Sequence, residues 1–218
     1  MFTAVLFDLD GTLVHTKDEY RYKIVGGVLD KLGIRGKLRE SKFKKFVDKF
    51  WFEEGRDQTI EDFLGVHANE FWKIFRELDT PKKRARALKV YEDVDFLDKL
   101  KSSGFKIAIV TGAPPMIAEL ELELLGKHKF DQIIIANPLS GIEPKPDPRG
   151  ILLALERLQA SPRNSVYVGN SEGDLMAAKK IGVYDVFVDR GEYPIKFTKV
   201  KPSLKIRTLY ELSDLLKI

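Results

Sequence analysis

Residues 3–13 read TAVLFDLDGTL, a short apolar run followed by two acids and a glycine–threonine pair. The run Thr3–Leu9 shows no helical periodicity, so we interpret it as a buried strand. The Asp-Gly-Thr sequence at 10–12 then breaks the run, as the residues of a tight turn do. We therefore expect a strand that ends at two carboxylates, Asp8 and Asp10.

Four later apolar runs have the same character, and helix-like segments lie around them. The predicted strands are Phe105–Val110, Gln132–Ala136, Ser165–Val168 and Asp185–Val188. The predicted helices are Val94–Ser102, Met116–Leu125, Pro148–Leu158, Asp174–Ile181 and a closing Thr208–Leu216. Repeated strand–helix–strand units predict an α/β fold, with a parallel sheet that carries helices on both faces.

The interval between the first two predicted strands, from about His15 to Lys89, contains no convincing strand. In Lys42–Phe52 and Asn69–Leu78, aromatic residues recur at three- and four-residue spacings, a pattern typical of amphipathic helices. We therefore expect a small all-helical insertion, and we interpret its aromatic stripe as its own core.

The composition narrows the possible functions. The chain has 218 residues, 44% of them hydrophobic and 32% charged, which suits a packed core domain with a smaller inserted one. The absence of cysteine excludes disulfides, thiolate metal sites and a cysteine nucleophile. We interpret the formal net charge of +4 as a lysine-rich solvated surface.

The sequence gives no sign of a nucleic-acid or membrane partner. None of the aromatic–basic motifs of known nucleic-acid-binding modules is present. No apolar run approaches the roughly 18 to 20 residues that span a bilayer. Residues 1–10 carry acids and lack the basic start of a signal peptide, so we expect a cytoplasmic protein.

Polar residues follow the carboxyl ends of four predicted strands. They are Asp8 and Asp10 after the first strand, Thr111 and Gly112 after the second, Lys145 after the third, and Asn170, Ser171 and Asp174 after the fourth. Ligands of doubly wound sheets bind beyond this edge. We therefore expect one site that gathers carboxylates, a lysine, hydroxyls and backbone amides.

Four segments at these strand ends, FDLDGTL, IVTG, KPDP and VGNSEGD, resemble in this order the four motifs of the haloacid dehalogenase-like hydrolase superfamily. The resemblance covers nearly all of the sheet domain. It implies a Rossmann-like catalytic core of residues 1–14 and 90–218 and a helical cap domain of residues 15–89. It also implies phosphoryl transfer through an aspartate.

The resemblance assigns a role to each motif residue. Asp8 would attack phosphorus and form an acyl-phosphate, which splits one hard step into two. Asp10 would protonate the leaving oxygen and then deprotonate the attacking water. Lys145 would neutralise charge during the attack. The residues expected to bind the phosphate are Leu9, Asp10, Thr111, Gly112, Ala113 and Lys145.

The family also implies Mg²⁺, a hard cation that relieves the repulsion between the acids and the phosphate. The ligands expected from the resemblance are Asp8, Asp10, Asn170 and Asp174. Asn170 stands where the fourth motif usually has an acid, and its amide oxygen contributes no net charge. We therefore expect a metal affinity below the usual one.

The expected function is that of a Mg²⁺-dependent phosphatase that hydrolyses a small phosphorylated metabolite, a phosphomonoester, as a monomer or homodimer. A metal-independent 2-haloacid dehalogenase is an alternative that the neutral Asn170 favours and Asp10 opposes, because family dehalogenases lack an acid there. A phosphomutase and a non-catalytic binding or regulatory module with decayed motifs are further alternatives. The three histidines have no metal-ligand spacing, and only His15, four residues after Gly11, is a candidate to face the substrate.

Overall fold

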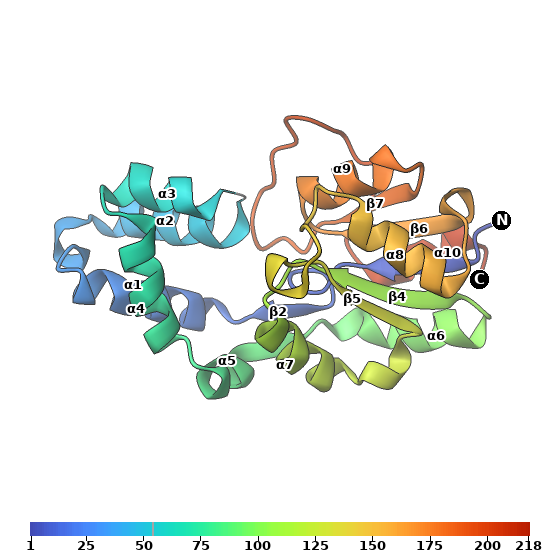
Figure 1. The fold of residues 1–218 in the computed structure, drawn as a ribbon, viewed down its shortest axis with the longest axis horizontal. Helices are drawn as coiled ribbons and strands as arrows, with labels where there is room; N and C mark the ends of the chain where they lie inside the picture. Colours follow the sequence, from blue (N-terminus) through green and yellow to red (C-terminus); the bar gives the residue numbers. More distant parts are fainter. Residues whose placement is uncertain (54) are drawn as a thin grey trace. The chain divides into compact units, whose positions relative to one another are not determined.

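The computed structural model describes residues 1–53 and 55–218, and the chain divides into two compact units (Figure 1). The sheet unit comprises Met1–His15 and Lys89–Ile218, and the helical unit comprises Thr16–Leu88. Each boundary lies one residue from the position expected from the sequence. Both units contain a buried apolar core of their own.

The sheet unit is built on six parallel strands in the order β5-β4-β1-β6-β7-β8. The strands are β1 (Ala4–Phe7), β4 (Lys106–Thr111), β5 (Gln132–Ile135), β6 (Ser165–Gly169), β7 (Tyr184–Val188) and β8 (Leu204–Ile206). In β1, Phe7 is in register with Ile109 of β4 and with Val168 of β6. Asp8, the residue after β1, therefore lies between the carboxyl ends of β4 and β6.

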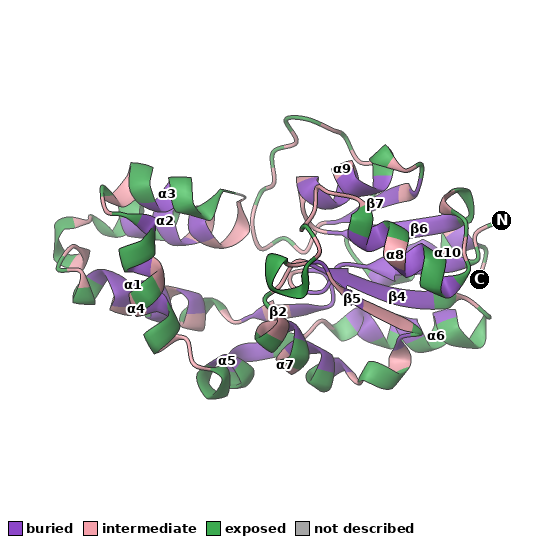
Figure 2. Ribbon diagram, viewed as in Figure 1, coloured by how far each residue is buried: buried purple, intermediate pink, exposed green. Residues whose placement is uncertain are grey.

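Helices cover both faces of this sheet, which confirms the predicted α/β architecture (Figure 1). They are α6 (Phe96–Ser102), α7 (Pro115–Leu125), α8 (Arg149–Leu158), α9 (Glu172–Lys180) and α10 (Leu212–Leu216). Short 3-10 turns are η2 (Glu92–Asp95), η3 (Lys127–Lys129), η4 (Pro138–Ser140), η5 (Pro162–Asn164) and η6 (Leu209–Glu211). All four residues of β1 are buried, as are most residues of β4 and β6, which are largely purple in Figure 2. The apolar run of β1 therefore reflects contact with a helix layer on each side.

The structure adds strands that the sequence does not predict. β8 is an edge strand of three residues with Lys205 exposed, so its burial is one-sided and its apolar signal is weak. β2 (Val14–Thr16) and β3 (Leu88–Val90) form a two-stranded sheet at the two ends of the insertion. The expectation of an all-helical insertion is therefore wrong at its ends, where each strand has only three residues.

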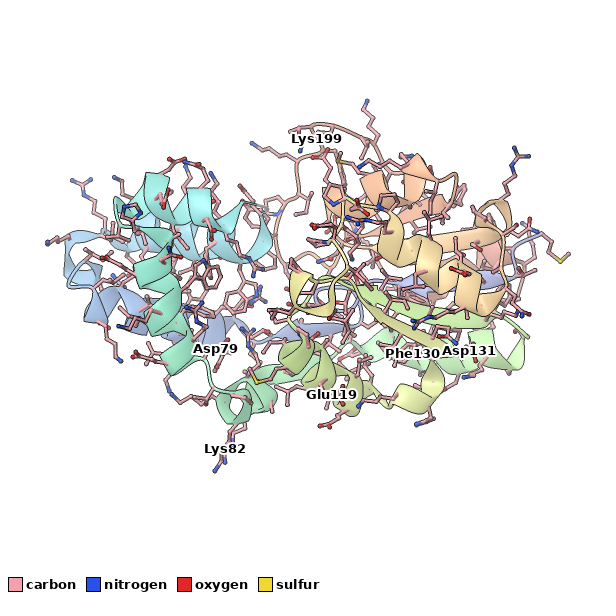
Figure 3. The ribbon with its side chains drawn as sticks, viewed as in Figure 1. Asp79, Lys82, Glu119, Phe130, Asp131 and Lys199 are labelled. Carbon is pink, nitrogen blue, oxygen red and sulfur yellow. The ribbon has the colours of Figure 1, made fainter. Side chains whose placement is uncertain are left out.

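The helical unit contains α1 (Asp18–Lys31), α2 (Glu40–Phe52), α3 (Arg56–Leu64), α4 (Ala68–Leu78), α5 (Pro81–Ala87) and the turn η1 (Arg35–Lys37). Its core confirms the interpretation of the aromatic stripe. Phe50 of α2 is buried, with its ring centroid 5.1 Å from that of Phe71 and 5.6 Å from that of Phe75. A buried ion pair joins Arg84 to Asp79, which Figure 3 labels, at 2.6 Å.

In the parts of the chain that the structure describes, the helices are all too short or too polar to cross a bilayer.

Candidate active site

The turn after β1 brings Asp8 and Asp10 to the carboxyl edge of the sheet. The Asp8 N–H donates to the Val168 carbonyl at 2.9 Å, which continues the pairing with β6. Gly11 has a φ of +79°, and a Cβ atom there would lie only 2.0 Å from Asn170 Nδ2. The backbone conformation therefore favours glycine, and any side chain here would displace the Asn170 side chain of the fourth motif.

Lys145 lies between two carboxylates. Its Nζ is 2.5 Å from Asp8 Oδ1 and 2.5 Å from Asp174 Oδ1, and it donates to the Tyr167 hydroxyl at 2.9 Å. The Tyr167 hydroxyl donates in turn to the Val110 carbonyl at 2.9 Å. The third motif thus reaches the first and the fourth through one ammonium group.

Tyr167 also belongs to this cluster, although no sequence motif predicts its role. It lies inside the buried run of β6, where an aromatic residue reads as core packing. The available signal is chemical, because a buried tyrosine needs a partner for its hydroxyl.

Burial dominates the electrostatics of Asp8. It raises the pKa of the Asp8 carboxyl from 3.8 to about 7, although the Lys145 ammonium acts in the opposite direction, and the Asp174 carboxylate adds to the rise. Burial alone would lower the pKa of Lys145, but the carboxylates of Asp174 and Asp8 outweigh it and hold that pKa well above its usual value. The lysine therefore stays charged, and further positive charge at this site would favour the ionised form of Asp8.

Asp174 is the N3 residue of a capping box that starts α9. Its Oδ2 accepts the N–H groups of Asn170 and Ser171, at 3.1 and 2.9 Å, and the Ser171 hydroxyl at 2.7 Å. Its Oδ1 faces Lys145. Both carboxylate oxygens are thus engaged by protein groups.

The loop after β4 holds the second motif. The buried Thr111 accepts the Ala113 N–H on its Oγ1 at 3.1 Å and keeps its hydroxyl proton to donate. The Gly112 carbonyl accepts from the side chain of Asn137 at 2.9 Å. Helix α7 begins only at Pro115, so Gly112 and Ala113 lie in the loop before the helix and not in its first turn.

The donor chemistry of the site fits Mg²⁺. The Asp8 carboxylate, the Asp10 carbonyl and the Asn170 amide oxygen are all hard oxygen donors. The Thr12 hydroxyl donates to Asn170 Oδ1 at 3.4 Å, which ties the amide of the fourth motif to the turn after β1. Within residues 1–53 and 55–218, no three His, Cys, Asp or Glu side chains gather as a metal site.

Glu172 does not replace the missing acid. Its carboxylate accepts the backbone N–H groups of Thr198 and Val200, at 2.7 and 3.1 Å, and that of Lys199, which Figure 3 labels in the loop after β7. Glu172 therefore organises that loop.

The three histidines have different surroundings. The His15 ring stacks on Tyr91 with centroids 4.7 Å apart, and its Nδ1 lies 3.0 Å from Glu192 Oε1. His67 is exposed beside Glu61, and His128 is exposed as well.

Comparison with known proteins identifies the family of this chain. The pattern of the haloacid dehalogenase-like hydrolase family matches residues 5–188. Pyrophosphatase PpaX of Bacillus velezensis is 30% identical over 187 residues, 83% of this chain and 80% of its own length. Phosphoglycolate phosphatase of Aquifex aeolicus is 28% identical, over 99% of this chain and 95% of its own length.

A crystal structure of a HAD phosphatase from Thermococcus onnurineus covers 99% of this chain and 98% of its own, with 29% identity and a TM-score of 0.69. The match spans the sheet, the four motif loops and the insertion. The chain therefore belongs to the haloacid dehalogenase-like hydrolase family and is a phosphatase.

Proposed function

We propose that this phosphatase is Mg²⁺-dependent and hydrolyses a small phosphomonoester through an aspartyl-phosphate on Asp8. The observation that carries the proposal is the Asp8 carboxylate at the end of the central strand, 2.5 Å from a lysine that Asp174 and Tyr167 also hold. A carboxylate held in this way is oriented before substrate arrives, which lowers the entropic cost of attack.

Each protein group has a defined role in the proposed reaction. An Asp8 oxygen forms a bond to phosphorus while the bond to the leaving oxygen breaks, and Asp10 gives its proton to that oxygen. The Lys145 ammonium offsets the negative charge that gathers around the transferred group. The Thr111 hydroxyl donates to a phosphate oxygen. Asp10 then takes a proton from the water that hydrolyses the acyl-phosphate.

Three groups would hold Mg²⁺: the Asp8 carboxylate, the Asp10 carbonyl and the Asn170 side-chain oxygen. When bound, the ion supplies positive charge that neutralises phosphate oxygens. We infer that Asp174 acts through its neighbours and not as a direct ligand, because both its oxygens are engaged. This revises the ligand set expected from the sequence, which includes Asp174.

For the substrate, we propose a small anionic phosphate compound. The relatives support this class, because one is named a pyrophosphatase and another a phosphoglycolate phosphatase. We propose that the helical unit serves as a cap, which contributes specificity by excluding water and contacting the leaving group.

The test is phosphate release from an aryl phosphate and from a panel of phosphoglycolate, sugar phosphates and pyrophosphate, with Mg²⁺ and with chelator. We expect Mg²⁺-dependent turnover that Asp8→Asn abolishes, and a preference for phosphoglycolate and pyrophosphate, which carry negative charge beyond the transferred phosphate. Halide release from a 2-haloacid that is insensitive to chelator would support the dehalogenase alternative. Equal rates on an aryl phosphate, whose aryl group carries no charge, would contradict the substrate class.

A further inference from the structure

The carbonyl of Thr12, in the turn between Asp10 and β2, is held by an arginine that follows β7, the second strand along the sheet from β1. Arg190 follows β7, and its Nε and Nη2 both donate to the Thr12 carbonyl oxygen, at 3.1 and 2.6 Å. Thr12 is fully buried and the Arg190 side chain is 7% exposed. Two donors of one rigid planar group therefore fix a single buried acceptor.

The guanidinium is itself anchored on its other side. Its Nη1 lies 2.6 Å from Asp93 Oδ2, and the same oxygen accepts the Leu209 N–H at 2.7 Å. Asp93 belongs to η2 and Leu209 to η6. Arg190 thus joins the catalytic turn to two further segments of the sheet unit.

An aromatic residue lies against the guanidinium. The Tyr91 ring centroid is 4.1 Å from Arg190 Cζ, and the Tyr91 hydroxyl donates to Glu192 Oε1 at 2.8 Å. Stacking of this kind restricts the rotation of the planar group. The arginine is held at its edge by Asp93 and at its face by Tyr91.

Thr12 is held from two directions by different parts of the chain. Its carbonyl accepts from Arg190, and its hydroxyl donates to Asn170 Oδ1 at 3.4 Å. Any neutral donor would satisfy a buried carbonyl. A bidentate, ion-paired and stacked arginine also fixes the direction in which the peptide plane points, and Asp10 lies only two residues upstream.

We propose that Arg190 is a positioning residue that fixes the turn at Asp10 so that its carboxyl group meets the leaving oxygen; this inference rests on the proposed function. In the reaction, the Asp8 oxygen–phosphorus bond forms, the phosphorus–leaving-oxygen bond breaks, and Asp10 delivers its proton to the departing oxygen. Arg190 contributes through geometry and does not touch the reacting atoms.

The test separates positioning of the acid from general damage. A p-nitrophenolate leaving group departs without much help from a proton, whereas an alkoxide needs one. The measured quantity is kcat/KM, which reports the steps through leaving-group departure, for p-nitrophenyl phosphate and for the best alkyl phosphate of the substrate panel. A purely structural defect would lower both values by the same factor.

For Arg190→Met we expect kcat/KM to fall about 100-fold for the alkyl phosphate and less than about 5-fold for p-nitrophenyl phosphate. Arg190→Lys keeps the positive charge beside Asp93 but loses the pair of donors, Nε and Nη2, that hold the Thr12 carbonyl. Its kcat/KM for the alkyl phosphate should therefore lie between those of wild type and Arg190→Met. Lys179→Met is the matched control, because it removes a cation 2.7 Å from the buried Asp185 in the same unit without touching the turn. Both its values should stay within about twofold of wild type.

Equal losses of kcat/KM on both substrates in Arg190→Met and Arg190→Lys would overturn the inference. A wild-type kcat/KM for the alkyl phosphate in either variant would overturn it as well. If Arg190→Met does not fold, the ratio in Arg190→Lys decides the question. Absence of phosphate release from the wild-type protein would instead contradict the proposed function, so the two failures are distinguishable.

Discussion

At the scale of single residues, the site depends on how one lysine is shared. The Lys145 ammonium is 2.5 Å from oxygens of both Asp8 and Asp174 and is buried with them. Two carboxylates and one ammonium leave the cluster with excess negative charge in a poorly solvated place. Burial is the main cause of the raised pKa of Asp8, Lys145 acts against the rise, and the Asp174 carboxylate adds to it.

The raised pKa of Asp8 predicts that the stability of the metal-free protein, measured in the presence of a chelator, depends on pH. Between pH 3.8 and about 7, the folded protein keeps a proton on Asp8 that the unfolded chain has released, so stability falls as pH rises through this window. Asp8→Asn removes the titrating group and should be the more stable protein above pH 7, by on the order of a few kcal/mol. Thermal melts of both proteins from pH 4 to 8 measure the difference. A difference that does not change with pH would contradict the assignment.

Asn170 predicts a weak metal site that one substitution strengthens. Asn170→Asp adds a negative charge beside the Asp8–Asp10 turn without changing the size of the side chain. We expect the half-saturating Mg²⁺ concentration for phosphatase activity to fall about tenfold, since changes around metal sites commonly alter affinity by this factor. Asn170→Ala, which removes the oxygen, should raise it. An unchanged Mg²⁺ titration in Asn170→Asp would remove residue 170 from the ligand set.

At the scale of elements, the site depends on the junction between β6 and α9. Gly169 ends the strand, and the Asp174 side chain folds back towards it because, as the N3 residue of the capping box, it accepts the N–H of the N-cap residue Ser171. A Cβ atom at Gly169 would lie 2.4 Å from Asp174 Cγ. The strand end, the helix cap and the partner of Lys145 therefore share one small volume.

This crowding predicts that Gly169→Ala destabilises the protein, by about 1–3 kcal/mol for overpacking alone, and lowers kcat by displacing Asp174. Gly36→Ala is the control, because a Cβ atom at Gly36 meets no other atom within 4 Å. Urea unfolding followed by circular dichroism compares the two variants. Similar urea midpoints for Gly169→Ala and Gly36→Ala would mean that the junction between β6 and α9 accommodates the methyl group without loss of stability.

At the scale of the whole molecule, the cores of the two units are built from different kinds of side chain. The sheet unit packs aliphatic strands against helices, whereas the helical unit packs rings from α2 and α4. Among the described residues, none in the core of the helical unit belongs to the four motifs. A substitution in that core therefore alters its packing without changing a motif residue.

A matched pair of leucine substitutions tests that core. Leu29 of α1 is 0% exposed and lies in the core of the helical unit, whereas Leu139 is 81% exposed. Leu29→Ala should cost about 2–5 kcal/mol of unfolding free energy through lost burial and a cavity. Leu139→Ala should change it by no more than about 0.5 kcal/mol. Chemical denaturation measures both, and a small effect at Leu29 would mean that the aromatic core repacks around the gap.

Much of the fold could be predicted because its signals are local. The buried run before Asp8 is apolar on both faces, and the four motifs follow strands whose ends meet at one edge of a parallel sheet. The edge strand β8 and the short strands β2 and β3 escaped prediction because three residues with partial burial leave too weak a pattern.

The sequence by itself determined the order of the strands along the chain, the acids that follow the first one and the family to which the motifs belong. Only the tertiary structure decided that Lys145 is shared by Asp8 and Asp174, that Glu172 faces residues 198–200, and that Arg190 holds Thr12. The physical reason is separation: Lys145 lies 137 residues from Asp8, and Arg190 lies 178 residues from Thr12. A local pattern reports which face of an element is buried, but the pairing of distant polar groups depends on how the folded chain brings them together.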